Sequence, residues 1–166
     1  MQKLVINNDE LFGKVVEILR TGRQVTIPVK GYSMLPFIRG EKDLVVLEPI
    51  CGGKGAFKKE DTESGGNLRR GDIVLFQYFG RYILHRVLSV KDGVAEIQGD
   101  GIVKNCEFCD LPHVYGRVVK ILRSGRRAVD PYCLWQRFLL WCWNLAYPLR
   151  RYLLAIYRRL PWNRDL

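Results

Sequence analysis

The sequence predicts a mostly β domain that begins with one helix and ends in an amphipathic helical tail. Short apolar runs separated by turn residues fill most of residues 24–122, whereas apolar residues recur at helical spacing near the two ends. The 166 residues are about one domain in length and can bury a normal core. We therefore divide the chain into a β domain at 1–130 and a tail at 131–166.

The N-terminal third predicts a helix followed by two strands. Helical spacing extends over residues 8–20, and Thr21-Gly22 ends it. Residues 24–29 alternate between polar and apolar and predict a strand, and residues 44–47 predict the next. The segment 52–67 is rich in glycine, lysine and glutamate, so we expect a mobile surface insertion within the same domain.

Ser33 is the first candidate for chemistry. It stands between Gly31 and Met34-Leu35-Pro36, and a proline lacks a backbone donor and biases the residue before it toward an extended conformation. Ser33 is therefore predicted on a bend, where its side chain can be presented outward. The ordinary alternative is a turn serine that bonds only to local backbone.

The later strands are predicted from their turns. Two aromatic-rich runs at 73–79 and 82–90 predict a hairpin with Gly80-Arg81 as its tight turn, and residues 114–122 predict a closing strand. Asp92-Gly93 is the strongest two-residue hairpin signal in the chain.

The Asp92-Gly93 turn also predicts a pair of side chains. A strict two-residue turn sets the register, and extending that register along both strands places His85 directly opposite Asp100 on one face. This inference depends on the register, because a slip by one residue would send the two side chains to opposite faces.

Three segments together resemble the signal peptidase type I and LexA-like serine peptidase superfamily, over about residues 25–122. The first contains Ser33-Met34, Pro36, Gly40, Asp43 and the apolar run 44–47. The second contains Gly71-Asp72-Ile73-Val74 and, on the following strand, His85-Arg86-Val87; the third is Gly99-Asp100. His85 occupies the position where bacterial-type enzymes have a lysine, so the chain is most similar to the Ser-His type of the endoplasmic reticulum and archaea.

The resemblance implies a signal peptidase/LexA-like β fold and a serine endopeptidase that cleaves an extended segment of a precursor protein or peptide through an acyl-enzyme. Ser33 would be the nucleophile and His85 its base, because a serine hydroxyl needs a base and a histidine with a pKa near 6.5 can serve at neutral pH. Asp100 would orient the imidazole. Tyr32, Met34 and Pro36 are expected to contact the substrate. Lys30 is a rival base, but it lies three residues before Ser33 and faces a different direction.

The chain departs from the Ser-His type at three places. Those enzymes carry a further acid a few positions after the Gly-Asp segment, where this chain has Val103 to Cys106 and no acid. Gly101 replaces their usual asparagine. Their N-terminal membrane span is not recognised either, because residues 1–6 are short and polar residues follow them.

The tail contains much of the positive charge. Lysine and arginine total 27 against 17 acids, a formal net charge of +10, and residues 131–163 contain five arginines and no acid. Arg137, Asn144, Arg151 and Arg158 recur every seven residues and predict one polar stripe. The opposite side is predicted to be apolar and to carry Leu134, Phe138, Trp141, Leu145, Tyr152 and Ile156. Pro148 is expected to kink the segment or to start a second helix.

We expect residues 131–160 to bind a membrane surface, with the arginines toward anionic headgroups. The longest uncharged apolar run has 12 residues, too few to span a bilayer, so the expected location is cytoplasmic and peripheral on the inner face. Alternatively, the tail packs on its own domain or on a partner, and the protein could then be a non-catalytic peptidase-fold protein that docks through its tail. Nucleic acid is not expected, because no recognisable binding module accompanies the basic stripe.

The cysteines predict reduced thiols. There are five, an odd number, and they are irregularly spaced. Cys106 and Cys109 have the spacing of half a zinc site, but no second pair completes it, so neither a metal nor another cofactor is expected.

Overall fold

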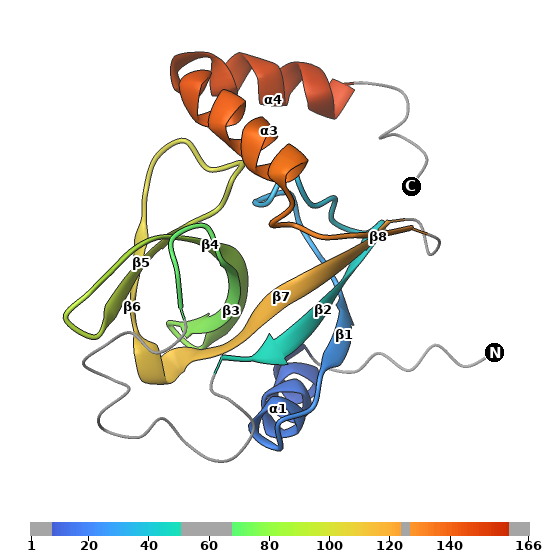
Figure 1. The fold of residues 1–166 in the computed structure, drawn as a ribbon, viewed down its shortest axis with the longest axis vertical. Coiled ribbons are helices and arrows are strands. Elements are labelled where there is room, and N and C mark those ends of the chain that lie inside the picture. The colour runs from blue at the N-terminus through green and yellow to red at the C-terminus, as the bar shows by residue number, and fades with distance from the viewer. Residues whose placement is uncertain (1–7, 51–67, 124–126, 160–166) are drawn as a thin grey trace.

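The computed structural model describes residues 8–50, 68–123 and 127–159. They form an eight-stranded antiparallel sheet in the order β1-β2-β7-β3-β4-β5-β6, with β8 paired to β7 (Figure 1). The strands are β1 (Val25–Pro28), β2 (Asp43–Pro49), β3 (Ile73–Tyr78), β4 (Arg81–Lys91), β5 (Val94–Gln98), β6 (Glu107–Asp110), β7 (Val114–Arg123) and β8 (Arg127–Val129). The predicted mostly β class is confirmed.

Helices lie at the two ends of the chain, as predicted. Helix α1 (Asn8–Arg20) packs against the sheet near β1, β2 and β7 (Figure 1). The tail contains α3 (Leu134–Leu145), the 3-10 turn η2 (Tyr147–Leu149) and α4 (Arg150–Arg159), and a further 3-10 turn, η1 (Leu111–His113), precedes β7. Pro148 lies in η2, so a second helix does begin after the proline.

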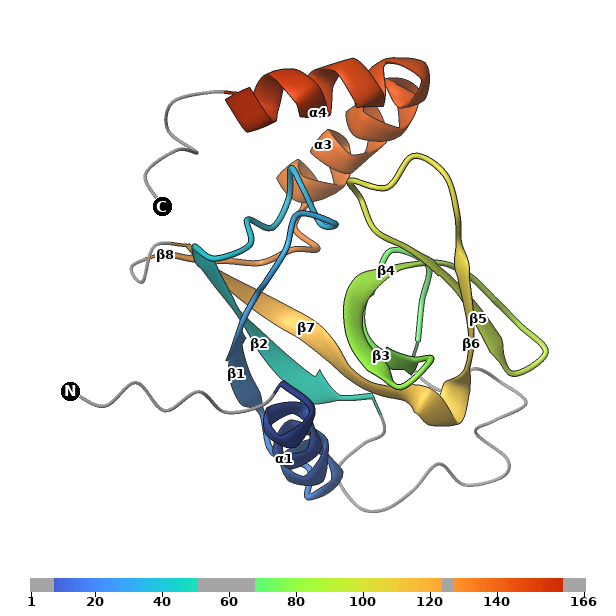
Figure 2. The ribbon, with the colours of Figure 1, turned by 180° about the vertical axis from the view of Figure 1, so that it is seen from behind.

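The sheet curls, and its two parts enclose separate core clusters (Figure 2). The first cluster joins α1, β1, β2 and the segment after β1, with Leu19, Phe37 and Ile38 among its buried members. The second fills the curl formed by β3 to β6 and contains Phe76 and Ile97. Strand β3 contributes alternate residues to both clusters, which is the side-chain period of a strand.

The β4-β5 hairpin begins as predicted and then changes register. Asp92 and Gly93 form the turn with φ values of 50° and 77°, and Lys91 pairs with Val94. The pairing continues to Ser89 and Glu96, but the next pair is Val87 with Ile97, so Leu88 has no opposite residue. This bulge shifts the register by one residue. The predicted pairing of His85 with Asp100 is therefore wrong.

The remaining differences from prediction are small. The β3-β4 turn is Phe79-Gly80, with φ values of 45° and 75°, one residue earlier than the predicted Gly80-Arg81. Strands β6 and β8 were not predicted, because each has only three or four residues and contains charged side chains. The predicted insertion at 52–67 lies outside the described residues.

The tail covers one end of the sheet (Figure 1), and the side chains of its predicted apolar side are exposed to solvent. Leu139, Leu140 and Trp143 pack against the first core cluster. The exposed side carries Leu134, Trp135, Phe138, Trp141, Leu145, Tyr152 and Ile156. Within the described residues, none of the helices has the length and hydrophobicity to cross a membrane.

Candidate functional site

Ser33 lies on a bend between β1 and β2, as predicted. Residues 33–37 form consecutive turns: the backbone N–H of Leu35 donates to Tyr32 at 3.3 Å, and that of Ile38 donates to Met34 at 3.0 Å. The Leu35-Pro36 peptide bond is cis. Ser33 is half-buried, whereas Met34, Leu35 and Ile38 anchor the bend in the core.

Local contacts hold the two ends of the bend together. Asp43, which is 1% exposed, accepts the backbone N–H and a guanidinium N–H of Arg39, each at 2.9 Å. Gly31 has a φ of 79°, in the left-handed region that favours glycine. A side chain at position 40 would overlap the backbone of Gly31. Position 40 must therefore be glycine for the two ends of the bend to lie so close together.

The loop at 99–102 lies directly against this bend. The backbone N–H of Gly101 donates to the Ser33 carbonyl at 2.7 Å. A Cβ atom on Gly101 would lie 2.9 Å from the Tyr32 carbonyl oxygen, so the close approach leaves no room for a side chain there. This contact explains why position 101 is occupied by glycine.

His85 lies on the other side of the same contact. A Cβ atom on Gly99 would lie 2.6 Å from the Ser33 carbonyl oxygen and 2.9 Å from His85 Nε2. The imidazole and the Ser33 backbone are therefore neighbours, although they are 52 residues apart in sequence. The structure brings together the two residues predicted as nucleophile and base.

The two ring nitrogens of His85 have different surroundings. Nδ1 lies 3.1 Å from Glu107 Oε2, whereas Nε2 is buried and has no hydrogen-bond partner among the described residues. The carboxylate favours a proton on Nδ1, which leaves the Nε2 lone pair on the side of Ser33. This tautomer is the one that a base acting on Ser33 requires.

Burial lowers the pKa of His85 below its ordinary value of 6.5. His85 is only 3% exposed, so its charged form loses hydration. The negative charges of Glu107 and Asp100 oppose this effect but are smaller causes. The imidazole is therefore neutral, and able to accept a proton, at pH 7.

Asp100 does not contact His85 and belongs to a different cluster. Its two carboxylate oxygens accept from Arg86 Nε and a terminal guanidinium nitrogen, each at 2.8 Å. Arg86 also donates to the Gly71 carbonyl at 2.8 Å and stacks 5.5 Å from the Phe37 ring centre. Through Arg86, Asp100 thus joins the segments around the site, and it forms no hydrogen bond to the His85 imidazole.

Sequence reasoning missed Glu107. The predicted acid was sought in Val103 to Cys106, one residue too early. The assumption of an unbroken register, which the bulge at Leu88 overturns, had already assigned the carboxylate to Asp100. Glu107 begins β6 and pairs with Ile97 on β5, which brings it beside His85 on β4. The available signal was an acid soon after Gly99-Asp100, at the start of a short strand.

The predicted substrate contacts differ in accessibility. Tyr32 is 45% exposed and Pro36 is half-buried, so both can contact a bound chain. Met34 is 3% exposed and belongs to the first core cluster, which argues against a substrate contact for its side chain. The backbone N–H of Ser33 donates to no described residue and is free to stabilise an oxyanion.

The cysteines contribute no alternative site among the described residues. Cys106, Cys109, Cys133 and Cys142 form no disulfide with one another, and no described group of three or more His, Cys, Asp or Glu side chains could hold a metal. Burial raises the pKa of the Cys109 thiol to about 11, so it remains protonated at neutral pH.

In comparisons with known proteins, no family model matches this chain, and no curated protein matches its sequence significantly.

Proposed function

We propose that this protein is a serine endopeptidase of the signal-peptidase-like type, with Ser33 as nucleophile, His85 as base and Glu107 as the residue that orients His85. One observation carries the proposal: a buried imidazole beside the Ser33 bend has Nδ1 paired with a carboxylate and Nε2 without a hydrogen-bond partner among the described residues. Such an asymmetric histidine suits proton transfer from a serine.

The proposed reaction is hydrolysis of a peptide bond through an acyl-enzyme. His85 Nε2 takes the Ser33 hydroxyl proton as the oxygen attacks the scissile carbonyl, and the Ser33 N–H stabilises the oxyanion. The imidazolium, stabilised by Glu107, then gives its proton to the leaving amine. Water hydrolyses the resulting ester with His85 again acting as base. The substrate would be an extended segment of a precursor protein or peptide near Tyr32 and Pro36.

The first test compares protein N-termini in cells that express wild type or Ser33→Ala. We expect new N-termini with the wild type and their loss in the variant, because the acyl-enzyme cannot form without the hydroxyl. Mass spectrometry of labelled N-termini identifies the cuts and the residues before each cut.

Ser89→Ala is the matched control. Ser89 lies on β4 and donates to Glu96 at 2.9 Å, so this variant removes a hydroxyl from the same sheet without touching the bend. Ser89→Ala should retain every cut. Identical N-termini for wild type and Ser33→Ala, with both proteins folded and abundant, would exclude the peptidase.

The tail supports a second proposal, that the protein docks on an anionic membrane surface, peripherally and on its inner face. The exposed side of α3 carries Trp135, Phe138 and Trp141, whose ring centres lie 5.8 and 6.2 Å apart in succession. Arg151 and Arg159 of α4 are exposed and would meet the headgroups, and residues 131–163 contain no acid to repel them. This docking is compatible with the peptidase and would also serve a non-catalytic protein.

A further inference from the structure

A cavity of about 990 Å³ lies between the tail and the sheet, and its lining includes Gly99 and Asp100, which adjoin the candidate site. Its lining comes from the segment before β3, from strands β4 and β7, and from α3 with the start of α4. Arg86 lines it, whereas His85, the preceding residue, faces the second core cluster, because neighbours along a strand point to opposite faces. Neither Ser33 nor His85 lines this cavity.

The cavity is strongly basic, with seven arginine or lysine residues in its lining and three aspartates. All three aspartates already have partners. Asp100 is paired with Arg86, Asp72 accepts the Arg69 backbone N–H at 2.8 Å and contacts Arg117, and Asp130 accepts the Tyr132 N–H at 2.8 Å. The lining therefore has an excess of positive charge that its own acids do not neutralise.

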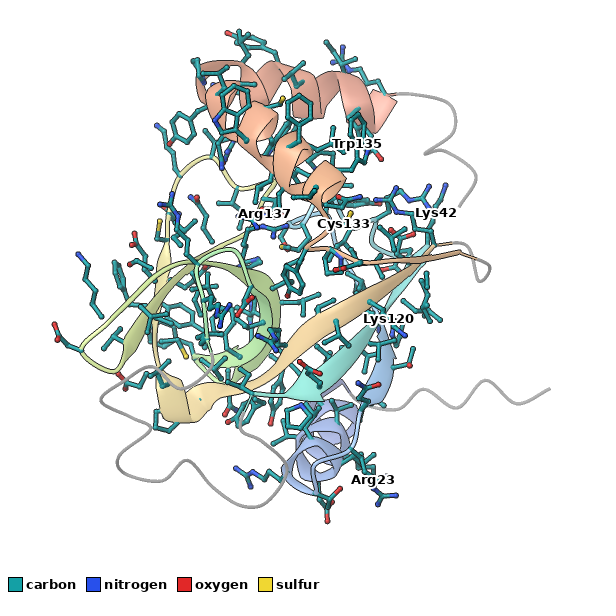
Figure 3. All side chains as sticks on the ribbon, viewed as in Figure 1. Arg23, Lys42, Lys120, Cys133, Trp135 and Arg137 are labelled. Carbon is teal, nitrogen blue, oxygen red and sulfur yellow. The ribbon has the colours of Figure 1, made fainter. Side chains whose placement is uncertain are left out.

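Four of the basic side chains at the cavity are exposed and form no ion pair with another residue that the structure describes. They are Arg69, Arg70, Lys120 and Arg137. They come from three separate parts of the chain, and Figure 3 shows Arg137 between α3 and the sheet. Cations that converge on one hollow from separate segments favour an anion between them.

Arg150 is a second, independent indication of an anionic ligand. It is only 5% exposed, and its guanidinium lies 5.4 and 5.2 Å from the ring centres of Trp143 and Tyr147. It donates to the Trp143 carbonyl and to Asn144 Oδ1, but it pairs with no carboxylate among the described residues. A buried cation without a counter-charge is costly, and burial lowers the pKa of Arg150 accordingly.

We propose that this cavity binds a phosphate-bearing ligand. Guanidinium groups match phosphate oxygens with paired hydrogen bonds, and the cavity volume suits a headgroup or a small phosphate ester. The phosphate can belong to an anionic phospholipid or to a soluble ester. The exposed aromatic side of α3 borders the cavity at Trp141 and favours the lipid. The proposal does not depend on the peptidase, so Ser33→Ala should bind the ligand as the wild type does.

The test uses the full chain and two probes, sn-glycerol 3-phosphate and phosphatidylcholine vesicles with or without phosphatidylglycerol. Calorimetry measures binding of the soluble ester, and co-sedimentation measures binding to vesicles. Arg137→Gln and Lys120→Gln should each weaken binding about tenfold for whichever probe the wild type binds, because each variant removes one charge-assisted contact. The two variants change opposite sides of the cavity, so a folding defect in one leaves the other informative.

Arg151→Gln is the matched control, because Arg151 is an exposed arginine of α4 that does not line the cavity. It should bind sn-glycerol 3-phosphate as the wild type does, and any loss of vesicle binding should be smaller than that of either cavity variant. If sn-glycerol 3-phosphate binds, a soluble phosphate ester is sufficient as the ligand. If only phosphatidylglycerol vesicles bind, the ligand is the lipid headgroup.

Three results would overturn the proposal. One is that neither probe binds, and another is that Arg137→Gln and Lys120→Gln weaken binding no more than Arg151→Gln. The third is that a single-stranded oligonucleotide binds more tightly than either phosphate probe, with the same sensitivity to the two variants.

Discussion

Two carboxylates lie near His85, and their other partners decide which one can orient the imidazole. Both carboxylate oxygens of Asp100 accept hydrogen bonds from the Arg86 guanidinium, each at 2.8 Å. Glu107 Oε2 lies 3.1 Å from His85 Nδ1, and the Glu107 side chain is 15% exposed. Glu107 can therefore both fix the tautomer and stabilise the imidazolium, whereas the charge of Asp100 is largely neutralised by its own partner.

Glu107→Gln tests this assignment through the pH profile. The charge of Glu107 raises the pKa of His85, so its removal lowers that pKa further below 6.5. The acid limb of kcat/KM should then move to lower pH, while the plateau falls by about 10²-fold because the imidazolium is less stabilised. The assay is cleavage of a peptide that spans a cut found in the N-terminus comparison.

Glu96→Gln is the control for this change. Glu96 lies on β5 and accepts from Ser89, so the variant removes an acid from the same sheet without contacting His85. Its pH profile should match the wild type. A Glu107→Gln variant with reduced stability but an unmoved acid limb would show that Glu107 is only structural.

Single residues were predictable where the local sequence determines their position. The bend at Ser33 follows from the glycine and proline around it, and His85 follows from its place in a strand. The orienting acid was not predictable in the same way, because it depends on a pairing between strands. One unpaired residue, Leu88, moves Asp100 away from His85, and no turn residue or charge marks that bulge in the sequence.

At the scale of elements, the loop at 99–102 connects the tail to the serine. On one side, Gly101 donates to the Ser33 carbonyl at 2.7 Å. On the other side, Trp143 of α3 donates from Nε1 to the Asp100 carbonyl at 2.8 Å, and the Tyr147 hydroxyl donates to the Val103 carbonyl at 2.8 Å. The tail helices therefore help to hold the loop that supports the bend.

Trp143→Phe should loosen this connection. Losing the indole hydrogen bond removes about 1 kcal/mol of unfolding free energy and leaves the Asp100 carbonyl without its partner. Local opening of the loop should become easier, so the Gly101 amide should exchange its hydrogen faster. Hydrogen exchange resolved at residues 99–102 measures this effect, and chemical denaturation measures the change in stability.

Trp141→Phe provides the comparison on the same helix. Trp141 is 61% exposed and makes its ring contact with Phe138, so this variant should leave exchange at Gly101 unchanged. Equal protection of the Gly101 amide in wild type and Trp143→Phe would disprove the mechanical link between tail and bend.

Elements were predictable in proportion to their length and to the strength of their turns. The helix at 8–20 and the Asp92-Gly93 hairpin are as expected, because helical spacing and a left-handed turn are local signals. Strand β6 is four residues long, and its pattern of charges resembled a loop. Its position follows from pairing with β5, a tertiary effect that single-sequence patterns do not contain.

The whole molecule presents three distinct surfaces. The Ser33 bend and His85 lie where the 99–102 loop meets the segment between β1 and β2, the basic cavity is lined by α3 and the sheet, and the aromatic side of the tail is exposed. Sequence periodicity grouped the tail residues by face, but it did not reveal which residues pack inward. Leu139, Leu140 and Trp143 do so because they meet the first core cluster.

The outward face predicts binding to anionic vesicles. Trp135 and Phe138 are 64% and 51% exposed, so their transfer into the interface removes apolar surface from water. Replacing both by alanine should weaken binding to phosphatidylglycerol vesicles about tenfold at low salt. The residual binding should fall further in high salt, because screening weakens attraction between the arginines and the headgroups. Co-sedimentation over a lipid series gives the partition constants.

Phe79→Ala separates this effect from a general loss of exposed aromatic surface. Phe79 is 89% exposed at the β3-β4 turn and lies outside the tail, so its removal should leave the partition constant unchanged. Wild-type binding by the double variant would contradict membrane docking through this face. A second contradicting result would come from light scattering: the wild type is a dimer that binds no vesicles, and the double variant is a monomer. A second copy of the chain would then cover the aromatic rings.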